Sequence, residues 1–201
     1  LLPGRSSNDP KPEIHPAGHQ NRSTPIRWHS AAPAERSLRI AEPGNHSAYI
    51  MEMGMRILYV GFKGKNNTSF QLVSALDGER LLLTNSFSGI ERDIEAMNAE
   101  YDAVIMFGLN KNLSNAVRIE NQAALHGDTL STVLATAQMA ERFVKNGIHC
   151  EISERPTYYL CNDAYYRMLR KTNGKAMFVH IPGSRYMTDE LMEGIVKSLG
   201  E

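Results

Sequence analysis

The stretch MRILYVGF, residues 55–62, decides the fold class. Its middle, RILYVG at 56–61, is a short apolar run that ends in glycine, and this pattern predicts a buried strand. A methionine followed by such a strand is a common opening for an α/β domain. The composition also changes here, because seven of the nine prolines and the only tryptophan lie in residues 1–54. We therefore expect a disordered or non-native tail over 1–54 and an α/β domain over 55–201.

The rest of the domain alternates apolar runs of strand length with segments whose apolar residues recur at helical spacing. Strands are predicted over 80–86, 102–108, 115–124, 148–153, 157–160 and 176–181. Helices are predicted over 70–77, 89–100, 129–146, 162–171 and 189–199. Continuous apolar strands that alternate with helices favour a three-layer α/β/α sandwich with a mostly parallel central sheet.

Helix ends and faces can also be predicted. Thr68 or Ser69 could cap the first helix, and Thr188 fits the N-cap of the last one, because a hydroxyl can accept a hydrogen bond from a free N–H of the first turn. The helix predicted over 129–146 would bury one face, which consists of Val133, Ala137, Ala140 and Val144.

The bulk properties exclude several kinds of partner. The 201 residues include 22 basic and 22 acidic side chains with no basic stripe, which argues against nucleic acid and a membrane surface. No apolar run approaches the roughly 20 residues of a membrane span, and the start lacks a signal-peptide pattern. Two cysteines make no disulfide framework, which favours a reduced, cytoplasmic setting. Whether the chain forms a homo-oligomer is left open by the sequence.

One of the two cysteines lies at a junction, in PTYYLCNDAYYRMLRK at 156–171. Cys161 follows the predicted strand TYYL, 157–160, and comes just before, or within, the first turn of the next helix, which Asn162 could cap. Free N–H groups and the positive end of the helix dipole would stabilise a thiolate there, lower its pKa, and bind an oxyanion. A small buried side chain is the alternative interpretation.

A histidine offers the base that a cysteine nucleophile needs. His180 lies near the end of the predicted strand 176–181, just before Pro182 and Gly183. Because ligands bind at the carboxyl ends of parallel strands, Cys161 and His180 could meet at one edge of the sheet. A histidine in a strand is also often a core residue, so both interpretations remain. Cys150 lies inside an apolar strand and is interpreted as packing.

These residues resemble a known family. TYYLCNDAYYRML, 157–169, closely resembles the cysteine block of the pyroglutamyl peptidase I (pyrrolidone-carboxylate peptidase) family, and AMFVHIPGS, 176–184, resembles its histidine block. The resemblance covers most of 55–201 in the family's block order, as a shortened and divergent member. Three weaker blocks are MRILYVGF, DTLSTVLATAQMAERFVKNGIHCEIS and TDELMEGIVKSL.

The resemblance implies a cysteine peptidase that removes an N-terminal pyroglutamyl residue, or that hydrolyses a related small amide. Cys161 would be the nucleophile and His180 the general base and acid. Phe62 matches the first aromatic of the family's substrate loop, and it is a substrate-binding candidate together with Asn162. The substrate would be a peptide or small amide. The resemblance implies no metal and no organic cofactor.

Two departures bear on activity. The loop GFKGKNNTS, 61–69, is shorter than the family's and lacks its second phenylalanine. The family's catalytic glutamate strand best matches AVRIEN, 116–121, anchored on Asn121, which puts Ala116 at the glutamate position. Glu120 is the second candidate for this acid, since a shifted register could let it serve, although four residues along a strand span roughly 13 Å.

Two further functions therefore stay open. One is a catalytically impaired relative that keeps the fold and binds a small molecule or a protein. The other is an unrelated flavodoxin-like α/β binding domain. The first loop has too little glycine, and no Gly-Lys-Ser/Thr, for a phosphate loop of the usual kind.

Overall fold

The structure, a computed structural model, describes residues 54–200. The predicted tail over 1–54 lies almost wholly outside the described residues, so its boundary stays a prediction. The strands are β1 (Ile57–Phe62), β2 (Glu79–Leu83), β3 (Ala103–Leu109), β4 (Ala116–Glu120), β5 (Gln122–Leu125), β6 (Asp128–Ser131), β7 (His149–Ser153) and β8 (Ala176–Ile181). The helices are α2 (Thr68–Ala75), α3 (Phe87–Glu95), α4 (Thr136–Lys145), α5 (Leu160–Lys171) and α6 (Asp189–Gly200).

Six strands form the main sheet in the order β2-β1-β3-β8-β4-β7. Four of its five pairings are parallel, and only β4 with β8 is antiparallel. The central strands are buried along their length, which explains why β3 and β8 are continuous apolar runs in the sequence. The predicted mostly parallel sheet is thereby confirmed.

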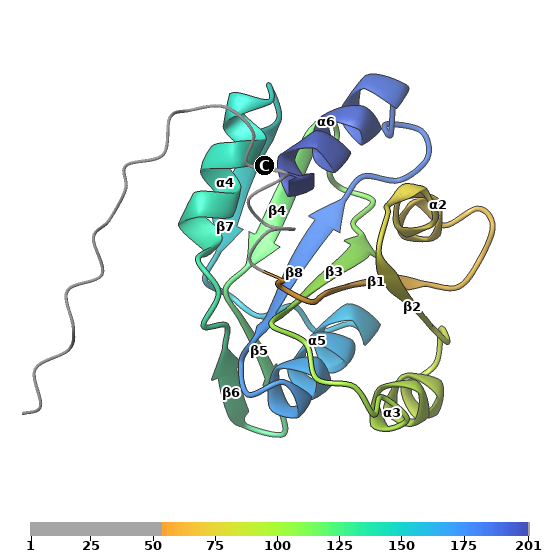
Figure 1. Cartoon of the computed structure of the whole chain (residues 1–201), viewed down its shortest axis with the longest axis vertical. Helices are drawn as coiled ribbons and strands as arrows, with labels where there is room; N and C mark the ends of the chain where they lie inside the picture. Colours follow the sequence, from red (N-terminus) through yellow and green to blue (C-terminus); the bar gives the residue numbers. More distant parts are fainter. Residues whose placement is uncertain (1–53, 201) are drawn as a thin grey trace, which may run out of the picture. The chain divides into compact units, whose positions relative to one another are not determined.

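Helices cover both faces of the sheet, which confirms the three-layer architecture (Figure 1). One face carries α3, α5 and the two-stranded β5–β6 hairpin, and the other carries α2, α4 and α6. Because side chains alternate along a strand, β8 contributes to both layers. Phe178 packs in the first core cluster, while Met177 and Val179 pack in the second.

The helix predicted over 129–146 is wrong in its first third. β6 occupies Asp128–Ser131 and pairs with β5, and α4 begins only at Thr136. The two-residue turn between the strands, His126 and Gly127, has φ angles of 51° and 85°, as hairpin turns of this length require. The predicted buried face is wrong at Val133 and Val144, which are 70% and 60% exposed, whereas Ala140 packs on the core and α4 buries Phe143.

Two strand predictions also need correction. The strand predicted over 115–124 is two strands, β4 in the main sheet and β5 in the hairpin, which separate at Asn121. The segment 157–160 is not a strand: Tyr158 and Tyr159 are exposed, and Leu160 already begins α5. Tyrosines have high strand propensity, but no neighbouring strand pairs with this segment.

The helix caps are partly as predicted. Asn67, rather than Thr68 or Ser69, caps α2, because its Oδ1 accepts a hydrogen bond from the Ser69 N–H at 3.0 Å. Thr68 instead donates to the Pro182 carbonyl at 2.8 Å, which ties α2 to the loop after β8. The Thr188 cap is confirmed by a 3.2 Å hydrogen bond from the Leu191 N–H to its hydroxyl.

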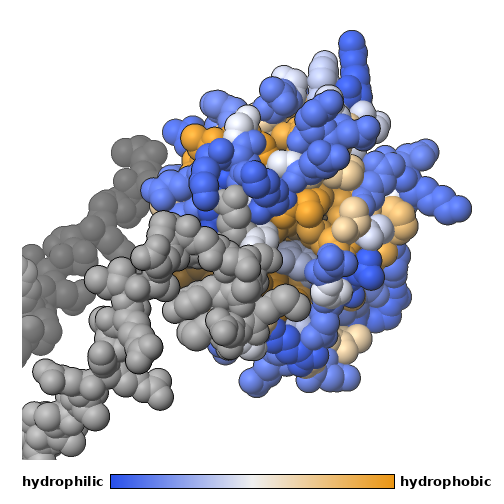
Figure 2. All heavy atoms as spheres, turned by 45° about the horizontal axis from the view of Figure 1, so that its top comes forward, coloured by the Kyte–Doolittle hydropathy of each residue, from blue (hydrophilic) through white to orange (hydrophobic). Residues whose placement is uncertain are grey.

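Hydrophilic side chains cover most of the described surface in Figure 2, with an apolar patch among them. Within residues 54–200, no helix is both long enough and apolar enough to span a bilayer. The larger apolar side chains that are exposed are Met55, Phe87, Val133, Val144, Ile152, Tyr158, Tyr159 and Tyr186.

Candidate active site

Three elements bring the predicted catalytic side chains to one face of the sheet. Cys161 lies in the first turn of α5, His180 near the end of β8, and Glu120 at the end of β4. In the antiparallel β4–β8 pair, Glu120 is opposite Phe178, two residues before His180. Opposite and diagonal residues of such a pair share a face, so the glutamate lies beside the imidazole.

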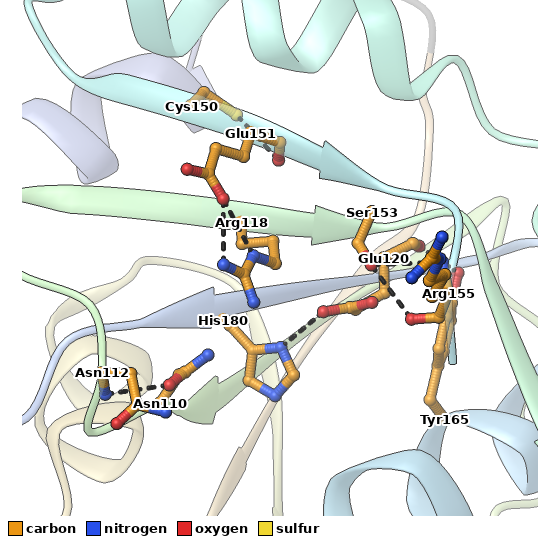
Figure 3. Close-up of polar contacts among 10 residues, drawn as sticks. All are labelled: Asn110, Asn112, Arg118, Glu120, Cys150, Glu151, Ser153, Arg155, Tyr165 and His180. Atoms are coloured by element: carbon orange, nitrogen blue, oxygen red, sulfur yellow. Dashed lines mark hydrogen bonds and ion pairs between the residues drawn. The ribbon is translucent and has the colours of Figure 1, made fainter. Parts of the chain in front are cut away.

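The Glu120 carboxylate and the His180 ring face each other in Figure 3, with Tyr165 reaching toward them from α5. Oε1 of Glu120 lies 2.9 Å from Nδ1 of His180, and both side chains are buried. An ionised carboxylate only accepts hydrogen bonds, so Nδ1 carries the proton and Nε2 is left as an acceptor. The Tyr165 hydroxyl donates to the Glu120 backbone carbonyl at 2.9 Å.

One oxygen of this carboxylate is unused. Oε2 of Glu120 is buried and has no hydrogen-bond partner among the described residues. A buried polar atom without a partner is costly. The site therefore offers an acceptor to a donor that a ligand or a water molecule would bring.

Cys161 and His180 line the same narrow cavity, which has about 160 Å³ of space between atoms and no room for a water-sized sphere. No hydrogen bond between Cys161 Sγ and His180 occurs within the described structure. The other lining residues are Glu120, Gln122, Thr157, Asn162, Tyr165 and Phe178. The site is thus assembled around a partly exposed Cys161, in a cavity too narrow for a water molecule.

Gly108 lets the cysteine approach the sheet. A Cβ at this position of β3 would lie 2.4 Å from Cζ of Phe178 and 3.0 Å from Sγ of Cys161. Both distances are too short for ordinary contacts, so only glycine fits here without movement. The Phe178 ring in turn packs on the His180 ring, with the centroids 4.9 Å apart.

The sulfur is less acidic than the sequence predicted. Burial is the main cause that raises the pKa of Cys161 to about 11; the residue's own backbone N–H opposes this rise, and the Glu120 charge adds to it. The predicted low thiol pKa at the helix start is therefore wrong for this structure, because desolvation outweighs the helix N-terminus. Burial also raises the pKa of Cys150 to about 11.

Ala116, the position matched to the family's glutamate, does not lie beside His180. Ala116 pairs with His149 of β7, four residues before the strand end that faces His180. Glu120, the second candidate, makes the contact with His180. A carboxylate that contacts the imidazole is thus present, at Glu120.

The two predicted substrate-binding residues have structural contacts. Phe62 is buried in the core cluster that also contacts Cys161, and it does not line the cavity. The Asn162 side chain bonds both backbone groups of Ala124, accepting from its N–H at 3.0 Å and donating to its carbonyl at 2.6 Å. It holds the β5–β6 hairpin against α5, and the substrate-binding roles stay predictions.

Sequence reasoning missed several residues around the sulfur. Tyr165 lies four residues after Cys161, so both occupy one helical face, and Phe178 lies two residues before His180 on one face of β8. These spacings could have identified both residues. Gln122 and Thr157 carry no such signal. Among the described residues, no cluster of three His, Cys, Asp or Glu side chains could hold a metal ion.

Fold and site together define a class: a three-layer α/β protein with a cysteine at a helix start, beside a buried carboxylate–imidazole pair. No protein-family model and no curated protein sequence matches the chain. Solved structures do match, and pyrrolidone carboxyl peptidases are among them.

A mutant pyrrolidone carboxyl peptidase from Pyrococcus furiosus is 18% identical, with a TM-score of 0.60 over 72% of this chain and 96% of that one. Pyroglutamyl peptidase I from Bacillus amyloliquefaciens is 17% identical, with a TM-score of 0.61 over 73% and 93%. The Thermus thermophilus enzyme is 19% identical, with a TM-score of 0.58 over 72% and 97%. The chain therefore has the pyrrolidone carboxyl peptidase fold, as the sequence resemblance predicted.

Proposed function

We propose that the chain is a cysteine peptidase that removes an N-terminal pyroglutamyl residue, or hydrolyses a related small amide. The observation that carries this proposal is the buried Glu120–His180 pair, 2.9 Å apart, in the same cavity as Cys161. A nucleophile, a base and a group that orients the base are the parts that covalent amide hydrolysis needs. The shared fold supports the same class of reaction.

In the first half of the reaction, Nε2 of His180 takes the thiol proton as the Cys161 sulfur bonds to the substrate carbonyl carbon. The carbonyl π electrons move to oxygen, and N–H groups at the start of α5 stabilise that oxyanion. The oxyanion collapses, the C–N bond breaks, and His180 gives its proton to the leaving amine. A thioester remains on Cys161.

In the second half, His180 takes a proton from water, whose oxygen attacks the thioester carbonyl. The C–S bond breaks, the acid product leaves, and the sulfur recovers its proton from His180. Glu120 keeps the proton of His180 on Nδ1 and stabilises the imidazolium that forms in each half. A histidine that acts as general base removes the need for a free thiolate, which fits a thiol pKa of about 11.

The test is release of a fluorescent amine from a pyroglutamyl amide. Turnover is expected for the whole chain and for Cys150→Ser, which alters the second cysteine. Activity should be lost in Cys161→Ser and in His180→Ala, and Glu120→Gln should lower kcat by about 100- to 10,000-fold. Equal background release by wild type and all variants would reject the proposal.

A second function is a binding module that keeps the fold without turnover. The raised pKa of Cys161 favours it, because a protonated thiol is a weak nucleophile. Such a module would bind a pyroglutamyl amide without releasing the amine, and Cys161→Ser would bind it equally well. Calorimetric titration of both chains separates the two functions, because an enzyme would also release the heat of hydrolysis.

A further inference from the structure

We propose that Phe87, the first residue of α3, contacts the acyl part of the substrate and determines specificity for an apolar ring there. This inference rests on the proposed function, since it concerns the same site. Nothing in the sequence pattern of the cysteine and histidine blocks points to Phe87.

Phe87 continues the buried stripe of its helix but is itself uncovered. Ile90 and Ile94, three and seven residues later, are 0% and 2% exposed and pack in the core cluster that Cys161 contacts. Residues at this spacing share one helical face. Phe87 is nevertheless 60% exposed, so the first turn of this apolar face projects beyond the core.

The register between α3 and α5 places Phe87 beside the cysteine turn. Arg167 bonds Glu91 at 2.8 Å, and Lys171 bonds the Glu95 carbonyl at 3.3 Å. Both contacts join residues 76 positions apart, so the two helices run parallel and in step. The same offset puts Phe87 level with the first turn of α5, and Figure 1 shows the two helices side by side.

The direction of the side chain follows from the helical turn of about 100° per residue. Ile90 faces the sheet, Glu91 faces α5, and Phe87 projects between these two directions. That gap leads to the start of α5, where Leu160 and Cys161 pack against the same core cluster. We therefore place Phe87 on the α3 side of the entrance to the sulfur, outside the residues that line the cavity itself.

The two sides of the entrance differ in polarity. The polar cavity residues Glu120, Gln122 and Thr157 lie toward β4, the hairpin and the segment before α5, whereas Phe87 lies on the α3 side. A small lactam has the same asymmetry, with an amide on one edge and methylene groups on the other. The geometry suits a ring whose amide edge meets the polar groups and whose methylenes pack on Phe87.

The test compares Phe87→Ala with Val144→Ala. Val144 is also 60% exposed, but it lies on α4, on the opposite face of the sheet. Losing an aromatic contact with the ring should lower kcat/KM for a pyroglutamyl amide by about 10- to 100-fold, mainly through KM. Val144→Ala should stay within twofold, and both melting temperatures should match that of wild type. Unchanged kinetics in a folded Phe87→Ala chain would overturn the inference while leaving the proposed function intact.

A binding measurement keeps the inference testable if wild type shows no turnover, which would reject the proposed function itself. Trp28→Phe combined with Phe87→Trp leaves one indole, at position 87. Titration with the uncleaved pyroglutamyl amide should shift its emission to shorter wavelength, and an indole at position 144 in place of Val144 should not respond. No shift at position 87 at saturating amide would overturn the inference.

Discussion

At the scale of the residue, Cys161 combines a proposed nucleophilic role with a pKa of about 11. The Glu120–His180 pair makes the nucleophilic role compatible with this pKa. A base oriented by a carboxylate can take the thiol proton during the attack rather than before it. The chemistry then resembles that of a serine hydrolase more than that of a pre-formed thiolate.

The pH dependence of alkylation follows from this. With iodoacetamide, the rate at Cys161 in a Cys150→Ser chain should rise about tenfold per pH unit from 7 to 10 without a plateau, because only the thiolate reacts. Glu120→Gln should lower the apparent pKa of Cys161, since it removes a charge that raises it. Cys150 in a Cys161→Ser chain should not respond to Glu120→Gln. An inflection below pH 8 in the unliganded wild type would contradict the burial argument.

Gly108 gives a second prediction at this scale. Gly108→Ala would place a methyl group 2.4 Å from the Phe178 ring and 3.0 Å from the sulfur, so both must move. We expect a loss of about 1–3 kcal/mol in the free energy of unfolding, as for other overpacked sites, together with lower kcat. Gly183→Ala is the control, because its Cβ would be 3.6 Å from Leu109, an ordinary contact. The measurement is the free energy of unfolding of both variants in urea, and equal values would contradict the steric argument.

At the scale of the element, the sequence predicted what depends on local pattern. β8 was predicted over its whole length because a strand buried along its length is a continuous apolar run. The region 129–146 failed because its small and β-branched residues suit a strand or a helix, and β6 forms only through pairing with β5. Glu120 was only the second candidate for a related reason: the antiparallel β4–β8 pairing that brings it to His180 is non-local.

The contact between Asp93 of α3 and Thr84, which follows β2, should be sensitive to acid. Burial opposes the charge of Asp93, but hydrogen bonds from the Thr84 hydroxyl and backbone N–H and from Lys63 lower its pKa from 3.8 to about 2. A pKa that is lower in the folded state stabilises the fold above pH 3.8, and this contribution is lost as the pH falls through 2.

Asp93→Asn should therefore lower the free energy of unfolding by about 1–2 kcal/mol at pH 7 and flatten its decline between pH 4 and pH 2. Glu95→Gln, which changes an exposed carboxyl on the same helix, is the control. The measurement is urea unfolding at pH 7, 4 and 2.5. A decline in Asp93→Asn as steep as in wild type would show that other carboxylates dominate the acid transition.

At the scale of the whole molecule, the two core layers share one sheet, and the candidate site lies on only one of its faces. The cluster beneath α3 and α5 contains Ile94, and the cluster beneath α2, α4 and α6 contains Ile195. Alternate residues of β8 belong to the two clusters. If the strands of the sheet separated, both layers would therefore lose the apolar surface on which they pack. The described domain should therefore unfold as one unit.

Ile94→Val and Ile195→Val test this unity. Both side chains are buried, at 2% and 0% exposure, and each loses one methyl group, so each should cost about 0.5–1.5 kcal/mol. Since the sheet separates them, the costs should add in the double variant. Urea transitions followed by far-ultraviolet circular dichroism and by tyrosine fluorescence should coincide in all three chains. Two transitions, or a variant that shifts only one probe, would mean that the face with the candidate site can open independently of the other face.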